Sequence, residues 1–546
     1  MKIKLSLAVA LLLSITAVFA QDGKPDKDWF LKSPGSDKVQ GVSMTEAYNT
    51  ILKNRKSQTV VVAVIDSGVD YDHEDLQDVM WVNPGEIAGN NKDDDNNGYV
   101  DDIHGWNFIG GKDGRNVNDD NLEVARVYKH LKPRFDGKSA SEISKKDRAE
   151  YERFKRAEKE IDDKHAENGA NIALYGGIVE SIGQIRTAIG KDEITVEDLE
   201  AFETDDENLQ QSILVLQNIM SRNPDLNEVE KELGNYVEYL EKSLKYNYNP
   251  DFDPRSDIVK DNYGDSYEKG YGNNIYDGPD AMHGTHVAGI IAATRGNDIG
   301  MDGVADNVRI MTVRAVPNGD ERDKDVANAI LYAVDNGAQV INMSFGKGFS
   351  WDKEAVDKAV KYALKNDVLL VHAAGNSAQN NDSSDNFPND GFDKKGLFGP
   401  KYAKNWMEVG ALDWKGGEKS TASFSNYGKA NVDIFAPGVD IYSTTPDDEY
   451  EYLQGTSMAS PVVAGVAAVL RSYYPDLTAV QVKEILMDTV DPVQGRVRKP
   501  GTKETVAFSE LAVSGGTINA LKAVKKAEKT KGKKKGVKRP MKNDKA

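Results

Sequence analysis

Three short segments, far apart in the chain, carry residue types that could together perform nucleophilic catalysis. The apolar run 60–66 ends in the carboxylate of Asp66, the imidazole of His283 opens a segment of small residues, and the hydroxyl of Ser457 opens another. A serine hydroxyl is too weak an acid to attack an amide unaided, so a base must take its proton as the new bond forms. His283 can serve as that base near neutral pH, and a carboxylate can orient it. Asp66, His283 and Ser457 are therefore the candidate catalytic residues.

A second cluster offers ligands for a hard cation. Residues 93–102 read DDDNNGYVDD, which places carboxylates and amides at alternate positions around a glycine turn. Oxygen ligands on a flexible, strongly negative loop are typical of calcium sites. The spacing resembles an EF-hand loop, but its twelfth position is His104 instead of Glu, and a solvated acidic turn is the alternative interpretation. The predicted ligands of a structural Ca²⁺ ion are the side chains of Asp93, Asp95, Asn97 and Asp101 and the carbonyl of Tyr99.

The elements that would position these residues alternate between strand and helix. Nearly unbroken apolar and β-branched runs, which suit strands buried on both faces of a parallel sheet, occur at 60–66, 310–313, 340–343, 368–374 and 432–436. Between them, apolar residues recur at helical spacing over 326–334 and 355–364, and Thr478 with Gln481 forms a capping box before another such pattern. This order predicts an α/β fold with a mostly parallel sheet and helices on both faces.

Residues 111–270 interrupt that order. Residues 141–169 are crowded with charged side chains, and 172–189 and 209–246 follow amphipathic helical patterns. We therefore expect a mainly helical insertion at 111–270 that splits the α/β domain into 21–110 and 271–520. Two roles stay open for it: a solvated bundle without a part in the chemistry, or a lid, partner surface or folding aid beside the active site.

The composition excludes several classes of function. The 546 residues include no cysteine, which removes disulfides, thiolate nucleophiles and thiolate metal sites. The 69 Lys and Arg stand against 88 Asp and Glu, a formal net charge of −19. A chain this acidic is not expected to bind nucleic acid, because phosphate contacts require a basic face.

The two ends of the chain differ from the rest. In residues 1–20, two lysines precede an apolar run that ends in small residues, which predicts a secretory signal peptide and export to the periplasm or the extracellular space. No other stretch is apolar for long enough to span a membrane once this peptide is removed. Residues 521–546 are rich in lysine and poor in apolar residues, so we expect a disordered tail.

The three candidate segments also resemble a known family. DSGVD from Asp66, HGTHVAG from His283 and GTSMASP around Ser457 are similar to the three active-site signatures of the subtilases, the subtilisin-like serine endopeptidases, in the same Asp–His–Ser order. The resemblance covers about 20–110 and 270–520. It implies a subtilisin-like fold, a triad that cleaves peptide bonds through an acyl-enzyme, and extended polypeptides as substrates.

Further site residues follow from the resemblance alone. Asn376, in a segment similar to the family's AAGN motif, is expected to donate to the oxyanion, and Asp75 with the loop 297–301 is expected to form a second calcium site. A non-catalytic binding protein on the same scaffold, and a narrowly specific processing protease instead of a broad degrader, are the alternatives. The residues expected to bind substrate are Ser344, Phe345 and Gly346 on one strand and Ala373, Ala374 and Gly375 along one wall of the first specificity pocket.

Overall fold

The structure is a computed structural model that describes residues 23–221, 225–393 and 400–533. The predicted signal peptide, residues 1–20, lies outside the described residues. By their contacts, the described residues fall into two compact units. Residues 25–127 and those from 253 onward form the first, here called the sheet unit. Residues 128–252, with 23–24, form the second, here called the helical unit.

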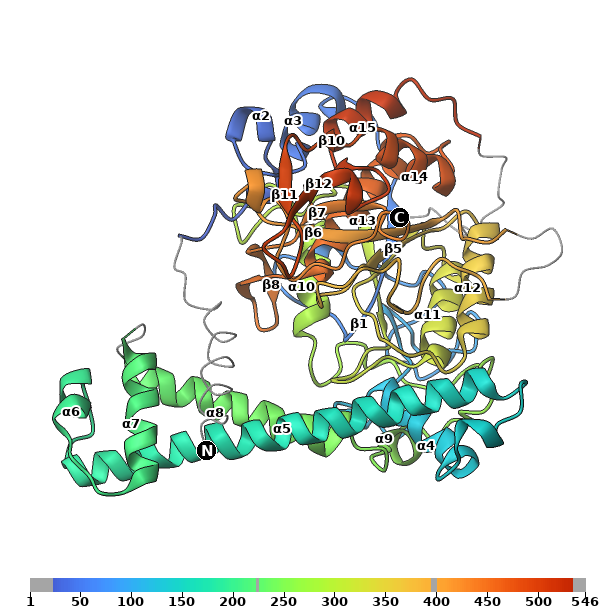
Figure 1. The fold of residues 1–546 in the computed structure, drawn as a ribbon. Coiled ribbons are helices and arrows are strands. Elements are labelled where there is room, and N and C mark those ends of the chain that lie inside the picture. Colours follow the sequence, from blue (N-terminus) through green and yellow to red (C-terminus); the bar gives the residue numbers. More distant parts are fainter. Residues whose placement is uncertain (1–22, 222–224, 394–399, 534–546) are drawn as a thin grey trace. The chain divides into compact units, whose positions relative to one another are not determined.

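The sheet unit is built on a nine-stranded sheet with the order β10-β13-β7-β6-β5-β4-β1-β3-β2. All of its strand pairs are parallel except β10 with β13. This confirms the predicted mostly parallel sheet (Figure 1). The strands are β1 (Val60–Asp66), β2 (Gly105–Asn107), β3 (Val308–Arg314), β4 (Val340–Met343), β5 (Leu369–Ala373), β6 (Trp406–Leu412), β7 (Ile434–Pro437), β10 (Asp491–Pro492) and β13 (Gly516–Thr517).

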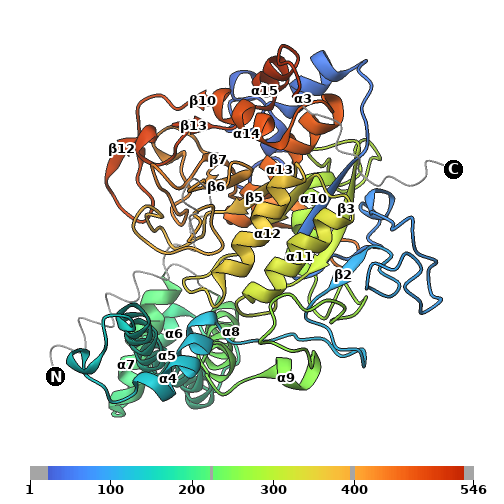
Figure 2. The same cartoon turned by 90° about the vertical axis from the view of Figure 1, so that its right-hand side faces the viewer.

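Both faces of this sheet are buried, as the apolar runs predict. In β1, Val60, Val62 and Val64 belong to one hydrophobic cluster, whereas Ala63 and Ile65 belong to a second. Because successive strand residues point to opposite faces, the two clusters lie on the two sides of the sheet. Figure 2 shows α11 (Asp323–Asp335) and α12 (Lys353–Lys365) running side by side. The first cluster includes helices α10 (Met282–Ala292), α13 (Thr456–Tyr473), α14 (Ala479–Asp488) and α15 (Ala520–Ala527), and the second includes α11 (Asp323–Asp335) and α12 (Lys353–Lys365).

Smaller elements complete the sheet unit. The predicted capping box is present, because the Thr478 hydroxyl accepts a hydrogen bond from the backbone N–H of Gln481 at the start of α14. Two antiparallel hairpins were not expected from the sequence. The remaining elements are the hairpins β8 (Ile441–Thr445) with β9 (Glu449–Leu453) and β11 (Arg496–Arg498) with β12 (Thr505–Ala507), and the short helices α2 (Pro34–Asp37), α3 (Met44–Ala47) and α9 (Pro254–Ile258).

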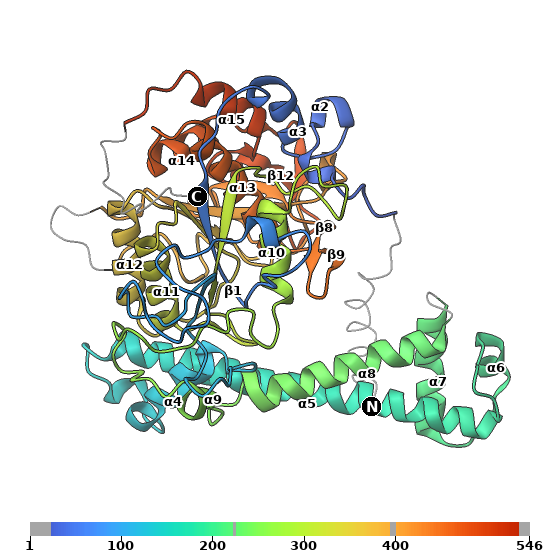
Figure 3. The ribbon, with the colours of Figure 1, turned by 180° about the vertical axis from the view of Figure 1, so that it is seen from behind.

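The helical unit is dominated by α5 (Arg148–Ile189), which packs against α8 (Leu226–Lys242) (Figure 3). The helical pattern over 209–246 corresponds to two helices, since α7 (Glu207–Met220) ends well before α8 begins. Asp225 caps α8 by accepting hydrogen bonds from two backbone N–H groups of its first turn. The short α6 (Val196–Ala201) completes the unit, and α4 (Glu123–Phe135) crosses its boundary. Residues 111–127 and 253–270, placed in the expected insertion, cluster with the sheet unit.

The C-terminal segment corrects one expectation. Residues 521–546 were expected to be disordered, but residues 520–527 form α15, capped by the Asn519 side chain. The prediction fails because Leu521 and Val524 share one face with alanines and are buried against α14 and α3, while the lysines occupy the other face. Residues 534–546 lie outside the described residues.

Candidate active site

Asp66 and His283 are joined directly. Asp66 ends β1, and its side chain is almost fully buried. Its Oδ1 accepts hydrogen bonds from the backbone N–H of Ser67 at 2.8 Å and from His283 Nδ1 at 2.6 Å. His283 is the second residue of α10. The fold thus brings together two side chains that are 217 residues apart in the chain.

A glycine allows α10 to approach the strand so closely. A Cβ atom on Gly284 would lie 3.0 Å from the carbonyl carbon of Gly68, closer still to its oxygen, and 3.2 Å from Asp66 Cβ. Ordinary contacts between carbon atoms are about 3.5–4.0 Å. The absence of a side chain at Gly284 is therefore what lets the neighbouring His283 reach the end of β1.

The geometry fixes the protonation of His283. A carboxylate only accepts hydrogen bonds, so Nδ1 carries the proton that Asp66 binds, and in the neutral ring Nε2 keeps a free lone pair. Burial of the imidazole opposes its charging, but the Asp66 carboxylate outweighs this effect and raises the pKa of His283. The side chain of His283 remains 40% exposed, so the ring is accessible from outside.

Ser457 is the second residue of α13 and lies against the end of β4. Its Oγ donates a hydrogen bond to the Ser344 carbonyl at 3.1 Å, and the Ser344 hydroxyl donates to the Ser457 carbonyl at 2.9 Å. Within the part of the chain that the structure describes, no hydrogen bond joins Ser457 to His283. The helices that carry these residues, α10 and α13, pack together on one face of the sheet.

The Asn376 side chain is oriented by the first residue of α13. Its Oδ1 accepts hydrogen bonds from the backbone N–H of Thr456 at 2.8 Å and from the Thr456 hydroxyl at 2.9 Å. Because the amide oxygen faces Thr456, the amide nitrogen faces away from it. Nδ2 and the backbone nitrogen of Ser457 lie 3.4 and 3.5 Å from the point that a Cβ on Gly455 would occupy. Two candidate oxyanion donors thus lie near one point.

The residues expected to bind substrate follow the ends of β4 and β5, which are neighbouring parallel strands. Ser344 is buried, Gly346 is exposed, and Phe345 is half-buried. The Phe345 ring packs against the core and meets the His372 ring edge-to-face at 6.1 Å. The Phe345 side chain therefore contributes to packing of the core.

The wall formed by the end of β5 is closely packed. Ala373 and Ala374 are buried, whereas Gly375 is partly exposed. The backbone N–H of Gly375 donates to the Thr456 hydroxyl at 3.1 Å. The start of α13 therefore contacts the ends of both β4 and β5, and Ser457 lies between them.

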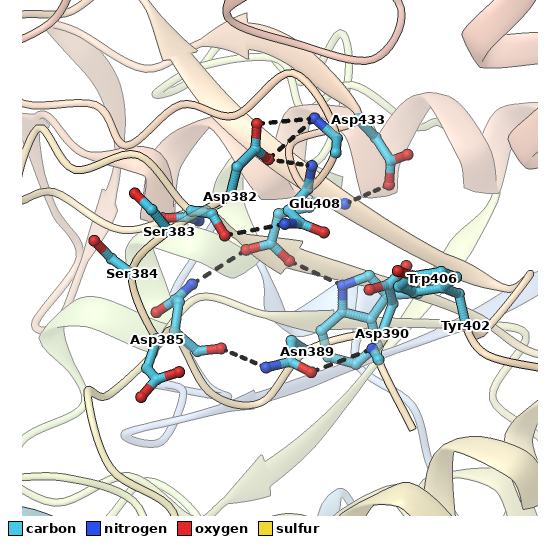
Figure 4. A pocket seen from close by; sticks show the side chains of 15 residues that line it. Asp382, Ser383, Ser384, Asp385, Asn389, Asp390, Tyr402, Trp406, Glu408 and Asp433 are labelled. Atoms are coloured by element: carbon cyan, nitrogen blue, oxygen red, sulfur yellow. Dashed lines mark hydrogen bonds between the residues drawn. The ribbon is translucent and has the colours of Figure 1, made fainter. Parts of the chain in front are cut away.

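A polar pocket of about 330 Å³ lies beside this wall (Figure 4). Glu408 of β6 lines it and accepts hydrogen bonds from Trp406 Nε1 and His372 Nδ1, both at 2.9 Å. Asp390 and Asp433 add further carboxylates, and burial, with some repulsion from Asp433, raises the pKa of Asp390 to about 6.

The expected calcium loop contains carboxylates in several roles. Asp93 accepts hydrogen bonds from the backbone N–H groups of Asn97 and Gly98, so it shapes the turn. Asp101 Oδ2 accepts from the backbone N–H of Asn91 at 2.6 Å, while its buried Oδ1 has no hydrogen-bond partner among the described residues. The Tyr99 ring is packed in the core.

Carboxylates converge elsewhere in the same region. Oxygen atoms of Glu86, Asp95 and Asp102 lie within 4.8 Å of one another. Of the predicted ligands, only Asp95 belongs to this group, and Asn97 joins it by donating to Asp95 and Asp102. Asp102 is fully buried, and burial raises its pKa to about 7. All of these potential ligand atoms are oxygens, and Asp101 Oδ1 has no hydrogen-bond partner among the described residues. Such a set of ligands suits a hard cation.

The residues expected to form a second cation site, Asp75 and the loop 297–301, are in contact. Asp75 is buried, and its carboxylate accepts hydrogen bonds from Asn297 Nδ2 at 2.7 Å and from the backbone N–H of Met301 at 3.3 Å.

Comparisons with known proteins point to one family. The sequence model of peptidase family S8, the subtilase family, matches residues 57–533. A thermophilic serine proteinase of Bacillus sp. (strain AK1) is 42% identical over 231 residues, which are 42% of this chain and 52% of that protein. Subtilisin DY of Bacillus licheniformis is 42% identical over 210 residues, 38% of this chain and 69% of that protein.

One solved structure, of proteases from Pseudoalteromonas arctica, is 31% identical to this chain with a TM-score of 0.36. The alignment covers 45% of this chain and 70% of the chain in that structure. The alignment with the AK1 proteinase spans about half of that protein's length.

Proposed function

Because the chain belongs to the subtilase family, we propose that it is a serine endopeptidase that hydrolyses peptide bonds of extended polypeptides. Ser457 is the nucleophile, His283 the general base and acid, and Asp66 the group that orients His283. The sheet unit carries this chemistry as a split domain, and the helical unit is an insertion into it.

The observation that carries the proposal is the 2.6 Å hydrogen bond between Asp66 and His283 Nδ1. It leaves Nε2 of an accessible imidazole free to take a proton, and it stabilises the imidazolium that forms. The Ser457 hydroxyl now donates to the Ser344 carbonyl. Rotation about its χ1 angle towards His283 is the movement that substrate binding must favour, since catalytic hydrogen bonds often form only in the complex.

The reaction then proceeds in two steps, formation of an acyl-enzyme and its hydrolysis. Ser457 Oγ bonds to the carbonyl carbon of the substrate while its proton passes to His283 Nε2, and His283 returns that proton to the leaving amine as the C–N bond breaks. Water, deprotonated by the same imidazole, hydrolyses the resulting ester and restores Ser457.

The oxyanion of each tetrahedral intermediate is bound by Asn376 Nδ2 and the backbone N–H of Ser457. The support for this is their shared proximity to one point and the bonds from Thr456 that hold the Asn376 amide in one orientation. Preorganised donors of this kind stabilise the transition state without a reorganisation cost.

Substrate binds as an additional strand. The backbone of Ser344, Phe345 and Gly346 continues β4 past its last paired residue, where an extended peptide can add main-chain hydrogen bonds. Ala373, Ala374 and Gly375 form the facing wall. This mode favours unfolded segments and loops over folded substrates.

A structural calcium ion is the proposed cofactor. Glu86, Asp95 and Asp102 would supply its carboxylate ligands, with Asp101 and Asn97 beside them. When bound, the ion would neutralise carboxylates that otherwise repel one another in a buried loop. It takes no part in the peptide chemistry.

We propose that the enzyme acts outside the cytoplasm, in the periplasm or the extracellular space. This rests on the predicted signal peptide. Within the described ranges, no helix is both long and apolar enough to cross a membrane. Cell fractionation of the expressing organism tests the location.

The decisive experiment is active-site labelling with a fluorophosphonate probe. The folded wild-type protein should be labelled and should cleave casein, and Ser457→Ala should abolish both. Ser460→Ala is the matched control, since this hydroxyl lies one turn further along α13 and also contacts Ser344; it should still be labelled. A folded wild-type protein that neither reacts nor cleaves would refute the proposal and favour a binding protein on this scaffold.

A further inference from the structure

We infer that Asn386 determines which substrate residue precedes the cleaved bond (P1) and restricts it to small side chains. The inference rests on the proposed function. It concerns the space between residues 344–346 and residues 373–375, which is the first specificity pocket. Because the start of α13 contacts both segments, a peptide acylating Ser457 directs its P1 side chain into this space.

The Asn386 amide lies between the two segments. A Cβ atom on Gly346 would lie 2.9 Å from Asn386 Oδ1, so the amide oxygen rests against that glycine. On the other side, Asn386 Nδ2 donates to the Ala374 carbonyl at 3.1 Å. One side chain thus reaches both segments of the pocket and occupies part of the space between them.

The backbone of Asn386 is held in place by the segment that follows β4. The residues that follow Gly346 and Asn386, Lys347 and Phe387, form an antiparallel bridge with two main-chain hydrogen bonds of 2.9 Å. The Asn389 side chain also donates to the Asn386 carbonyl at 2.8 Å. The segment that carries Asn386 is therefore anchored beside the substrate-binding strand.

A second hydrogen bond, to Glu408, fixes the orientation of the Asn386 amide. Asn386 Nδ2 also donates to Glu408 Oε1 at 3.2 Å. Glu408 is itself buried and held by Trp406 and His372. A large P1 side chain must displace the amide and break both of its hydrogen bonds, one of them to a buried carboxylate. A small side chain leaves them intact.

The expected preference is moderate. Steric discrimination in a pocket of this kind amounts to about 10- to 200-fold in kcat/KM. The wild-type protein should therefore cleave peptides with alanine at P1 at least about tenfold faster than otherwise identical peptides with phenylalanine. Asn386→Gly should remove that difference by raising kcat/KM for the phenylalanine peptide.

Asn381→Ala is the matched control. Asn381 Nδ2 donates to the same Ala374 carbonyl at 2.9 Å. If the role of Asn386 were only to hold this loop, both variants would change the P1 ratio alike. We expect Asn381→Ala to keep the wild-type ratio and Asn386→Gly alone to lose it.

The test measures kcat/KM for a peptide series that differs only at P1, with the wild-type protein, both variants, and Asn386→Ser as a milder change. A wild-type enzyme that cleaves the phenylalanine and alanine peptides equally well overturns the inference even if no variant folds. So does an Asn386→Gly protein with an unchanged ratio. Neither result affects the proposed function, which fails only if the wild-type protein cleaves no peptide and resists the fluorophosphonate probe.

Discussion

The close approach of α10 to the end of β1 gives a prediction with a magnitude. Gly284→Ala adds one methyl group at a point 3.0 Å from the Gly68 carbonyl carbon and 3.2 Å from Asp66 Cβ. Both atoms lie at or just beyond the end of β1, which carries the proposed catalytic carboxylate of Asp66. The Gly68 oxygen is closer still, so the helix start must move away by about 1 Å or more to restore ordinary contacts.

That movement acts on the neighbouring residue, His283. A misplacement of about 1 Å in a catalytic group can cost about 100-fold in rate. Overpacking a well-packed site costs about 1–3 kcal/mol of folding stability. Gly284→Ala should therefore lower kcat/KM by about 100-fold or more in a protein that still folds. The loss should lie mainly in kcat, because the substrate-binding strand is not touched.

The assay combines peptide hydrolysis with thermal unfolding. Gly169→Ala is the control, since Gly169 is an exposed position in α5 where an added Cβ meets no atom within 4 Å. It should leave activity unchanged and stabilise its helix by about 0.5–1 kcal/mol. If Gly284→Ala retained wild-type kcat/KM, the argument that backbone proximity positions His283 would be wrong.

Three further predictions concern the site and its loop. Asp66→Asn removes the charge that raises the pKa of His283. Because only the neutral imidazole accepts a proton, the acidic limb of the kcat/KM–pH profile should move to lower pH, and kcat should fall by about 10⁴-fold. An acidic limb that does not move would contradict this. Asn376→Ala should lower kcat by about 10²–10³-fold, the range found for such donors in other serine proteases, with KM nearly unchanged; a rise in KM of the same size would show substrate binding instead. Calcium at a hundred times its Kd should add about 2.7 kcal/mol of stability. EGTA should therefore lower the Tm of the wild-type protein more than that of Asp95→Asn, and equal shifts would remove Asp95 from the site.

Sequence patterns predict the sheet well where strands are buried on both faces. The runs that contain β1, β3, β4, β5 and β7 are apolar almost throughout, so their period and composition leave little choice. Strand β6 was missed because Glu408 and Gly410 interrupt its apolar run. A carboxylate can lie in this buried strand because Glu408 accepts hydrogen bonds from Trp406 and His372 inside the protein.

The residues of the candidate site likewise fall into those that sequence patterns predict and those that they do not. Asp66, His283 and Ser457 lie in segments whose residue types signal their chemistry, and the fold joins the first two directly. Thr456 and Glu86 carry no such signal. Their importance depends on what lies opposite them: an amide oxygen for Thr456, and two carboxylates for Glu86. Contacts of this kind are set by tertiary structure and have no local pattern.

Asn386 shows why specificity is harder to predict than catalysis. A catalytic group must have a particular chemistry, so its residue type narrows the choice, whereas a pocket is shaped by any side chain that the backbone carries into it. Asn386 enters the space beside Gly346 because Phe387 pairs with Lys347 beyond the end of β4. That pairing is isolated, lies outside every regular strand, and involves residues of unremarkable type. The reaction can therefore be argued from residue types, but the choice of substrate follows only from the position of one amide between two strand ends.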